Sequence, residues 1–111
     1  MYDPTQRHLT QLEPQTRLLA TYLIIAARNA GVPLIITSSR RSRLEQARLV
    51  LAGFSRTFNS RHLSGKAFDV DVAGWRRDDV PKDFWLALGN YAERLGLKWP
   101  LPEWDPAHFE V

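Results

Sequence analysis

The sequence predicts an α+β fold, in which two main helices and a shorter one pack on a small, mainly antiparallel sheet. Two long segments, 14–29 and 81–95, carry apolar residues at helical spacing. Short segments rich in β-branched or alternating apolar residues lie between and after them. The chain has 111 residues, of which 44% are hydrophobic and 24% charged, as in an ordinary globular domain. We therefore expect residues 1–111 to form a single domain around one core.

The helices are predicted from their start and stop signals. Pro14 suits the first turn of a helix, and Asn29-Ala30-Gly31 is a natural end. The apolar face expected for this helix comprises Leu18, Leu19, Tyr22, Leu23, Ile25 and Ala26. A shorter helix is expected from about Leu44 to Ala52, before Gly53. The second main helix is expected from Pro81 to Leu95, with Gly96 as its cap.

Three segments read as strands. Residues 33–39 combine β-branched residues with bounding Pro and Ser. From Lys66 onward, the apolar Phe68, Val70 and Val72 alternate with Asp69 and Asp71 on the other face. At the C-terminus, Phe109 and Val111 share one face, and His108 and Glu110 share the opposite one. If both strands bury their apolar faces in the same core, their polar faces point the same way, and Asp69 and His108 become cross-strand neighbours.

This convergence predicts a divalent-metal site. His62 lies just before the turn expected at Ser64-Gly65, next to the strand that holds Asp69. Zinc with three nitrogen or oxygen ligands from the protein and an open fourth position is a catalytic arrangement. Such a site needs a nearby carboxylate to accept a proton, and Asp105, three residues before His108, is the candidate. Because Pro106 follows it, Asp105 is expected to be extended rather than helical.

Composition excludes several classes of protein and leaves others open. The chain has no cysteine, which excludes disulfides, cysteine-based zinc sites and thiol nucleophiles. No apolar stretch is long enough to span a bilayer, and the N-terminus lacks the order of a secretory signal. The net charge of +3 fits a polyanionic partner, either nucleic acid, a membrane surface or a cell-wall polymer. Nucleic acid is disfavoured because the aromatic residues are not interleaved with the arginines.

Two separated motifs resemble those of the M15 family of zinc peptidases. The first is Ser60-x-His62-x-x-Gly65-x-Ala67-x-Asp69, and the second is Asp105-x-x-His108 followed by Phe109-Glu110. A looser similarity covers residues 37–42 with Gln46, and residues 97–99, so the resemblance extends over most of the chain. The family includes D-alanyl-D-alanine carboxypeptidases and dipeptidases, and phage L-alanyl-D-glutamate endopeptidases.

The resemblance implies a role for each matching residue. His62, Asp69 and His108 would bind one zinc ion, and Asp105 would be the general base. Arg41 aligns with the arginine that steadies the scissile carbonyl, although the family often has an aromatic residue where this chain has Arg40, so the choice between the two arginines stays open. Ser60 would contact substrate. Asp71 and Glu110 would be neighbours on the polar face, or partners that orient a histidine.

The function that follows is hydrolysis of the stem peptides of peptidoglycan by a zinc metallopeptidase. The leading expectation is a monomeric, phage-type L-alanyl-D-glutamate endopeptidase, or endolysin, with no nucleic-acid partner and no stable membrane insertion. It would be made in the cytoplasm without a signal peptide and would reach the wall, in the periplasm, after release through a holin. One alternative is a D-Ala-D-Ala carboxypeptidase, in which Arg43 could bind the terminal carboxylate of the substrate. Another is a metal-containing, non-catalytic module that binds the cell wall.

Overall fold

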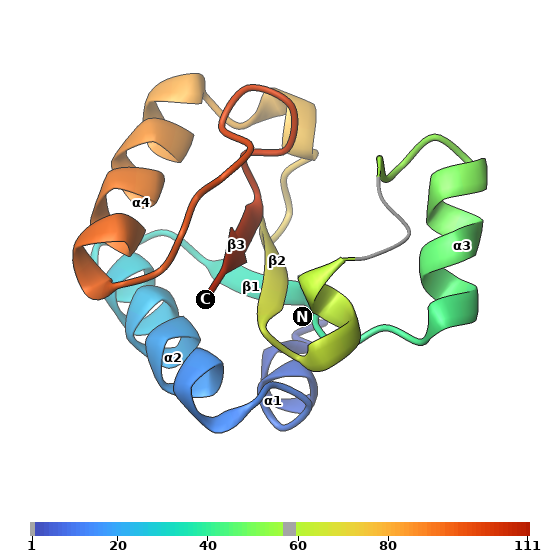
Figure 1. The fold of residues 1–111 in the computed structure, drawn as a ribbon. Helices are drawn as coiled ribbons and strands as arrows, with labels where there is room; N and C mark the ends of the chain where they lie inside the picture. Colours follow the sequence, from blue (N-terminus) through green and yellow to red (C-terminus); the bar gives the residue numbers. More distant parts are fainter. Residues whose placement is uncertain (1, 57–59) are drawn as a thin grey trace.

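Four α-helices and a three-stranded antiparallel sheet form the protein, as a computed structural model shows for residues 2–56 and 60–111 (Figure 1). The strands lie in the order β1, β2, β3, and α2 and α4 lie together on one side of the sheet. In chain order the elements are α1 (Thr5–Leu9), α2 (Pro14–Asn29), β1 (Leu34–Ser38), α3 (Arg43–Leu51), the 3₁₀ turn η1 (Arg61–Ser64), β2 (Ala67–Val72), the 3₁₀ turn η2 (Arg77–Asp79), α4 (Lys82–Leu95) and β3 (His108–Glu110). The predicted fold class is therefore confirmed, with one helix more than expected. The loop expected at 54–59 lies partly outside the described residues.

The register between β2 and β3 brings the two polar faces together as predicted. Asp69 pairs with His108 across the strands, and Phe68 pairs with Phe109 on the apolar side. The two phenylalanine rings stack with centroids 5.8 Å apart, and both are fully buried. Because side chains alternate along a strand, fixing the phenylalanine pair in the core also fixes Asp69 beside His108 on the opposite face.

Helix α2 packs through a face that only partly overlaps the predicted one, because Leu23 is buried and Leu19 packs against the core while three other predicted residues do not. Leu18, Tyr22 and Ile25 are about half exposed, at 52%, 48% and 50%. The buried residues of the helix recur at helical spacing on a stripe that shares Leu23 with the predicted face; they are Thr16, Ala20, Leu23, Ile24 and Ala27. Since nearly the whole circumference of this helix is apolar, periodicity alone could not select the stripe that meets the sheet. Small residues on the buried stripe, such as Ala20 and Ala27, allow close approach to the neighbouring elements.

Helix α1 was not predicted, because five residues are too few to give a periodic signal. Isolated helices of this length are unstable, so its stability must come from tertiary contacts. Thr5 accepts a hydrogen bond from the backbone N–H of Ile36 at 3.0 Å, and Arg28 contacts both Thr5 and Asp3. These bonds attach the N-terminus of the chain to β1 and to the end of α2.

Helix α3 stands apart from the body of the molecule, on the opposite side of the sheet from α2 and α4 (Figure 1). Its buried residue is Gln46, and its apolar residues Leu44 and Leu51 are exposed at 61% and 82%. The segment between α3 and β2 returns to the sheet through η1. Gly65 ends that turn at a φ of 72°, and a Cβ there would lie 3.1 Å from the backbone oxygen of Gln11. The glycine of the first motif is thus required by the turn and by its close contact with the chain before α2.

Within the described residues, no helix has both the length and the apolar character needed to cross a membrane.

Candidate metal centre

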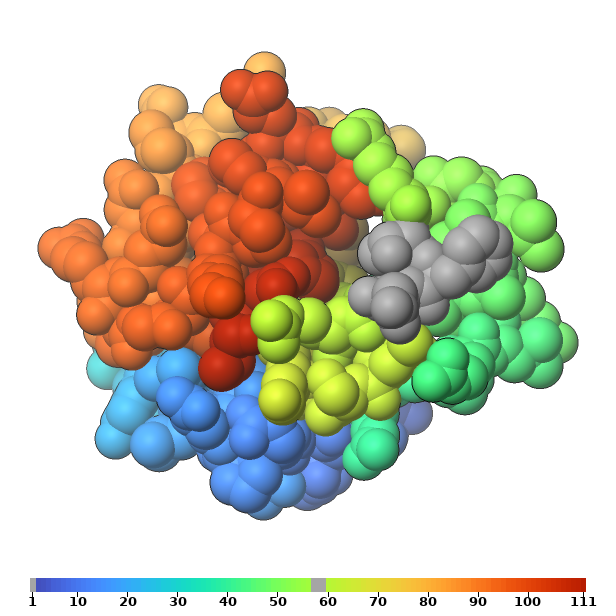
Figure 2. Space-filling model, viewed as in Figure 1, coloured from blue at the N-terminus to red at the C-terminus, as the bar shows by residue number. Residues whose placement is uncertain are grey.

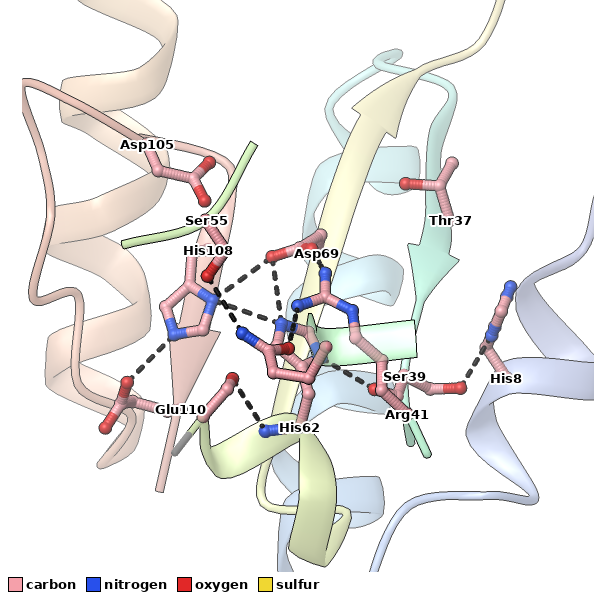
Figure 3. A network of polar contacts seen from close by, with 12 residues as sticks. His8, Thr37, Ser39, Arg41, Ser55, His62, Asp69, Asp105, His108 and Glu110 are labelled. Carbon is pink, nitrogen blue, oxygen red and sulfur yellow. Dashed lines mark hydrogen bonds and ion pairs between the residues drawn. The ribbon is translucent and has the colours of Figure 1, made fainter. Parts of the chain in front are cut away.

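Three buried side chains converge at the polar face of the sheet. They are His62 from η1, Asp69 from the middle of β2 and His108 from the start of β3 (Figure 3). Each offers one atom that could bind a metal, and these atoms all lie within 4.8 Å of one another. The structure thus brings together the three residues that the sequence predicts as ligands.

The distances among the three atoms match one face of a zinc tetrahedron. His62 Nε2 lies 3.3 Å from His108 Nδ1 and 3.3 Å from Asp69 Oδ1, and His108 Nδ1 lies 3.2 Å from Asp69 Oδ1. Zinc bonds to nitrogen and oxygen ligands are about 2.0–2.1 Å long, which gives a tetrahedral edge of roughly 3.3–3.4 Å. A zinc ion therefore fits against these three atoms without rearrangement of the side chains.

Hydrogen bonds orient each histidine so that the nitrogen nearest the other two ligands is free to bind a metal. His62 Nδ1 lies 2.6 Å from the backbone oxygen of Ser39, and His108 Nε2 lies 2.8 Å from Glu110 Oε1. Because these oxygens can only accept, the proton of each neutral ring is on the bonded nitrogen. The other two nitrogens, His62 Nε2 and His108 Nδ1, then face each other with lone pairs. A cation between them relieves this repulsion.

Asp69 is held as a carboxylate from both sides. Its Oδ2 accepts a hydrogen bond from Arg41 Nη2 at 2.8 Å, while its Oδ1 faces the two histidines. Burial raises the pKa of Asp69, but the protonated forms of His108 and His62, which donate hydrogen bonds to it and carry positive charge, outweigh that effect, so the pKa falls well below its ordinary value. The pKa of His108 is raised, because its hydrogen bond to Asp69 outweighs the effect of burial. The negative charge of Asp69 is therefore stabilised by Arg41 on one side and by the two histidines on the other.

Arg41, rather than Arg40, is the arginine at the site. Its second nitrogen, Nη1, donates to Gln46 Oε1 at 3.1 Å, and Gln46 Nε2 donates to Ser55 Oγ at 2.9 Å. Arg40 is exposed at the end of the sheet. Gln46 thus holds Arg41 against Asp69. This contact explains why the buried residue of α3 is polar.

Asp105 lies in the loop before β3, outside any helix, as predicted. Its carboxylate lines the same cleft as the three converging residues and lies 3.7 Å from Arg77 Nη1. Burial and the negative charge of Asp69 raise the pKa of Asp105, although Arg77 acts in the opposite direction. A raised pKa moves a carboxyl group toward the range in which it can both accept and return a proton near neutral pH.

The cleft above these groups has a volume of about 630 Å³ (Figure 2). The lining residues that the sequence had singled out are Arg41, Ser60, His62, Asp69, Asp105, His108 and Glu110. Ser60 also has a local role, because its Oγ accepts a hydrogen bond from the backbone N–H of His62 at 3.1 Å and begins η1. Arg43, considered for binding a substrate carboxylate, is exposed at the first position of α3 and does not line the cleft.

The structure assigns contacts to the polar neighbours of the site, one of which sequence reasoning missed. Glu110 contacts His108 and so can orient this histidine. Asp71 contacts Thr37 and Arg77 rather than a histidine, and is only a neighbour on the polar face. Arg77 was not singled out at all. Its position was the available signal, since an arginine five residues after a strand that carries carboxylates can fold back over them. His8, the remaining histidine, has no metal-binding motif around it in the sequence; it is half buried, and its Nδ1 lies 2.6 Å from Ser39 Oγ.

Solved structures share this fold. The L-Ala D-Glu endopeptidase ChiX of Serratia marcescens matches with a TM-score of 0.75 and 23% identity, over 96% of this chain and 85% of that one. The DacB structure from Streptococcus pneumoniae D39 matches with a TM-score of 0.65 and 20% identity, over 99% and 68%. A mutant of the D,D-pentapeptidase VanY of a VanB-type resistance cassette, in complex with Zn(II), matches with a TM-score of 0.65 and 18% identity, over 90% and 72%.

No protein-family model matches the sequence, and no curated protein matches it. The chain has the α+β fold found in this endopeptidase, in the D,D-pentapeptidase VanY and in DacB, which another solved structure names as an L,D-carboxypeptidase. Within that fold it has a His-Asp-His cluster that could hold a metal ion. The resemblance predicted from two short motifs is thus confirmed at the level of the fold.

Proposed function

We propose that the protein is a zinc-dependent peptidase that hydrolyses the stem peptides of peptidoglycan, with L-alanyl-D-glutamate endopeptidase as its activity. The observation that supports it most directly is the triangle of His62 Nε2, Asp69 Oδ1 and His108 Nδ1, with sides of 3.2–3.3 Å, at a cleft with a carboxylate of raised pKa. The fold adds support, because a structural neighbour is an L-Ala D-Glu endopeptidase and another is bound to zinc.

His62, Asp69 and His108 would hold the zinc ion. When bound, zinc would supply Lewis-acid activation of a water molecule and of the substrate carbonyl. Asp105 would take a proton from the attacking water and return it to the leaving amine. Arg41 would donate a hydrogen bond to the oxygen of the scissile carbonyl as negative charge develops there. Since its Nη2 already contacts Asp69, Arg41 would also keep that ligand in place.

Ser60 would contact the substrate from the edge of the cleft, in addition to beginning η1. The net charge of +3 would favour association with an anionic wall. We also propose that the chain acts on the wall as a lytic enzyme after release from the cytoplasm.

Mass spectrometry of purified peptidoglycan, incubated with the protein, tests the proposal. New L-Ala carboxyl ends and D-Glu amino ends, lost with a chelator and restored by zinc, are expected. Release of free D-Ala alone would instead identify a carboxypeptidase; VanYB, a structural neighbour, was solved in complex with D-Ala-D-Ala. If no bond is cut at any zinc concentration, the catalytic proposal is wrong.

The variant Asp105→Ala separates catalysis from binding. Loss of a general base lowers kcat by about 10²–10⁴-fold, while zinc affinity and wall binding should persist. Glu103→Ala is the matched control, because Glu103 is exposed in the same loop and does not line the cleft. A protein that binds the wall and shows no hydrolysis, with or without Asp105, would be a binding module.

A further inference from the structure

Four arginines line the cleft, against three carboxylates. Three of the arginines contact a carboxylate partner: Arg41 contacts Asp69 at 2.8 Å, Arg61 contacts Glu110 at 3.0 Å, and Arg77 contacts Asp71 at 2.9 Å and Asp105 at 3.7 Å. Arg56 differs from them. Among residues 2–56 and 60–111 it has no carboxylate within ion-pair distance, so its charge is not neutralised inside the protein.

Arg56 lies instead on the face of Trp104. The Cζ atom of its guanidinium is 4.1 Å from the centroid of the indole ring. In such a contact the ring attracts the cation without using its N–H donors, and the planar group remains free to form two parallel hydrogen bonds. The aromatic face also restricts the long side chain, which lowers the entropy cost of binding an anion.

The Arg56–Trp104 contact joins the two walls of the cleft. Arg56 belongs to the segment that follows α3, and Trp104 to the loop between α4 and β3, which also holds Asp105. The space-filling view shows these yellow-green and orange-red segments meeting beside the hollow (Figure 2). A peptide in the cleft would therefore pass next to the free edge of the Arg56 guanidinium.

We propose that Arg56, oriented by Trp104, binds a carboxylate of the substrate and makes the enzyme selective for peptides with an acidic residue or a free carboxyl end beside the scissile bond. This proposal rests on the proposed function, whose cleft it uses. A planar carboxylate matches the two-donor edge of an arginine. The role considered for Arg43 thus passes to a residue that the tertiary structure places at the site.

A binding experiment tests this selectivity without requiring catalysis. The probes are the dipeptide L-Ala-D-Glu, which has two carboxylates, and its diamide L-Ala-D-Gln-NH₂, in which both are carboxamides. Each is titrated by NMR into the zinc-loaded full chain bearing Asp105→Ala, which prevents hydrolysis. The indole N–H signal of Trp104, identified with Trp104→Phe, reports occupancy at this position. The same titrations are repeated with Arg56→Gln added.

The acid should bind about tenfold more tightly than the diamide, because a charge-assisted hydrogen bond contributes on the order of 1.5 kcal/mol. Arg56→Gln should reduce this ratio to about twofold or less. Arg40→Gln is the matched control, since Arg40 is exposed outside the cleft and its loss changes the net charge equally. It should leave the ratio unchanged.

Three results would overturn the proposal: equal affinity for acid and diamide, a ratio that survives Arg56→Gln, or an equal loss with Arg40→Gln. The last would indicate a general effect of net charge. Peptidoglycan hydrolysis by the unsubstituted chain is measured in parallel. If it hydrolyses the wall but Arg56→Gln has no effect on the ratio, only the role of Arg56 fails. If Arg56 controls the ratio but no bond is ever cut, only the catalytic function fails.

Discussion

At the scale of single residues, the two candidate histidine ligands present different nitrogens to the metal position. His62 would bind through Nε2 because Ser39 occupies Nδ1, and His108 through Nδ1 because Glu110 occupies Nε2. The first partner is a backbone oxygen, which no substitution removes. The second is a carboxylate, so the orientation of His108 depends on a side chain that can be tested.

Glu110→Gln should weaken zinc binding by about tenfold, because partners of this kind orient the ring and raise its basicity. The substitution keeps the shape of the side chain but removes the charge that faces His108 and Arg61. Zinc affinity is measured by competition with a chromophoric chelator, and Glu103→Gln, an exposed acid in the neighbouring loop, serves as control. Unchanged affinity in Glu110→Gln would show that β3 alone orients His108.

Arg77 affects the pH dependence of the proposed reaction. Its positive charge lowers the pKa of Asp105, against burial and the charge of Asp69, which raise it. A base works only when deprotonated, so activity is lost as pH falls through its pKa. Arg77→Gln removes the lowering effect and should move the acid limb of the kcat profile to higher pH.

The matched control for that profile is Arg76→Gln, which removes the same charge from an exposed neighbour. It should leave the acid limb in place. A shift toward lower pH in Arg77→Gln, or an equal shift in both variants, would contradict the assignment of Arg77 as the group that tunes Asp105.

At the scale of elements, the site depends on a loop that α4 holds in place. Trp99 donates from Nε1 to the backbone oxygen of Pro106 at 2.9 Å, and β3 begins two residues later. The indole ring packs directly over Gly89 of α4, where an added Cβ would lie 2.2 Å from a ring carbon. The absence of a side chain at Gly89 therefore sets how closely this loop approaches the helix.

Gly89→Ala should destabilise the protein by about 1–3 kcal/mol, although alanine normally stabilises a helix interior relative to glycine. The clash with Trp99 should also displace the loop that holds Asp105 and lower activity. The change is measured by chemical denaturation. Asn90→Ala, at the adjacent exposed position of α4, is expected to be neutral or slightly stabilising. A stabilising effect of Gly89→Ala would show that the ring moves aside at little cost.

At the scale of the whole molecule, the candidate metal centre joins parts of the chain that are far apart in sequence. His62 and His108 are 46 residues apart, and their rings lie with centroids 5.1 Å apart at the polar face of the sheet. A zinc ion bound there would link η1, β2 and β3. Binding to the native state alone stabilises it by mass action.

Zinc at 100 times its dissociation constant should stabilise the fold by about 2.7 kcal/mol, which corresponds to a rise in Tm of about 10 °C. A chelator should reverse the rise. Since the histidines must be neutral to bind metal, protons compete with zinc, and because the pKa of His108 is raised, the rise in Tm should already shrink as pH falls toward the ordinary histidine pKa of about 6.5. Calorimetry at several pH values measures it. A zinc effect that is independent of pH would point to a site made of carboxylates only.

Local patterns predicted much of the candidate site. Alternation along residues 66–73 and 108–111 placed Asp69 and His108 on one face and Phe68 and Phe109 on the other, and the observed register confirms this pairing. Such a prediction succeeds because the two faces of a strand are fixed by its geometry, and burial of the apolar face excludes a one-residue slip in register. The absence of cysteine likewise limited the metal ligands to histidine and carboxylate.

Tertiary packing decided the rest. The buried face of α2 could not be read from a helix that is apolar on nearly all sides, and α1 is too short to be predicted without its contacts to β1. The choice of Arg41 over Arg40, the position of Arg77 over Asp105 and the contact of Arg56 with Trp104 depend on how loops distant in sequence meet. The sequence alone determined the strands and the candidate metal ligands, because backbone geometry dictates where neighbouring side chains point. Only the folded structure determined which charges surround those ligands, because long arginine side chains can reach many partners and only packing selects one.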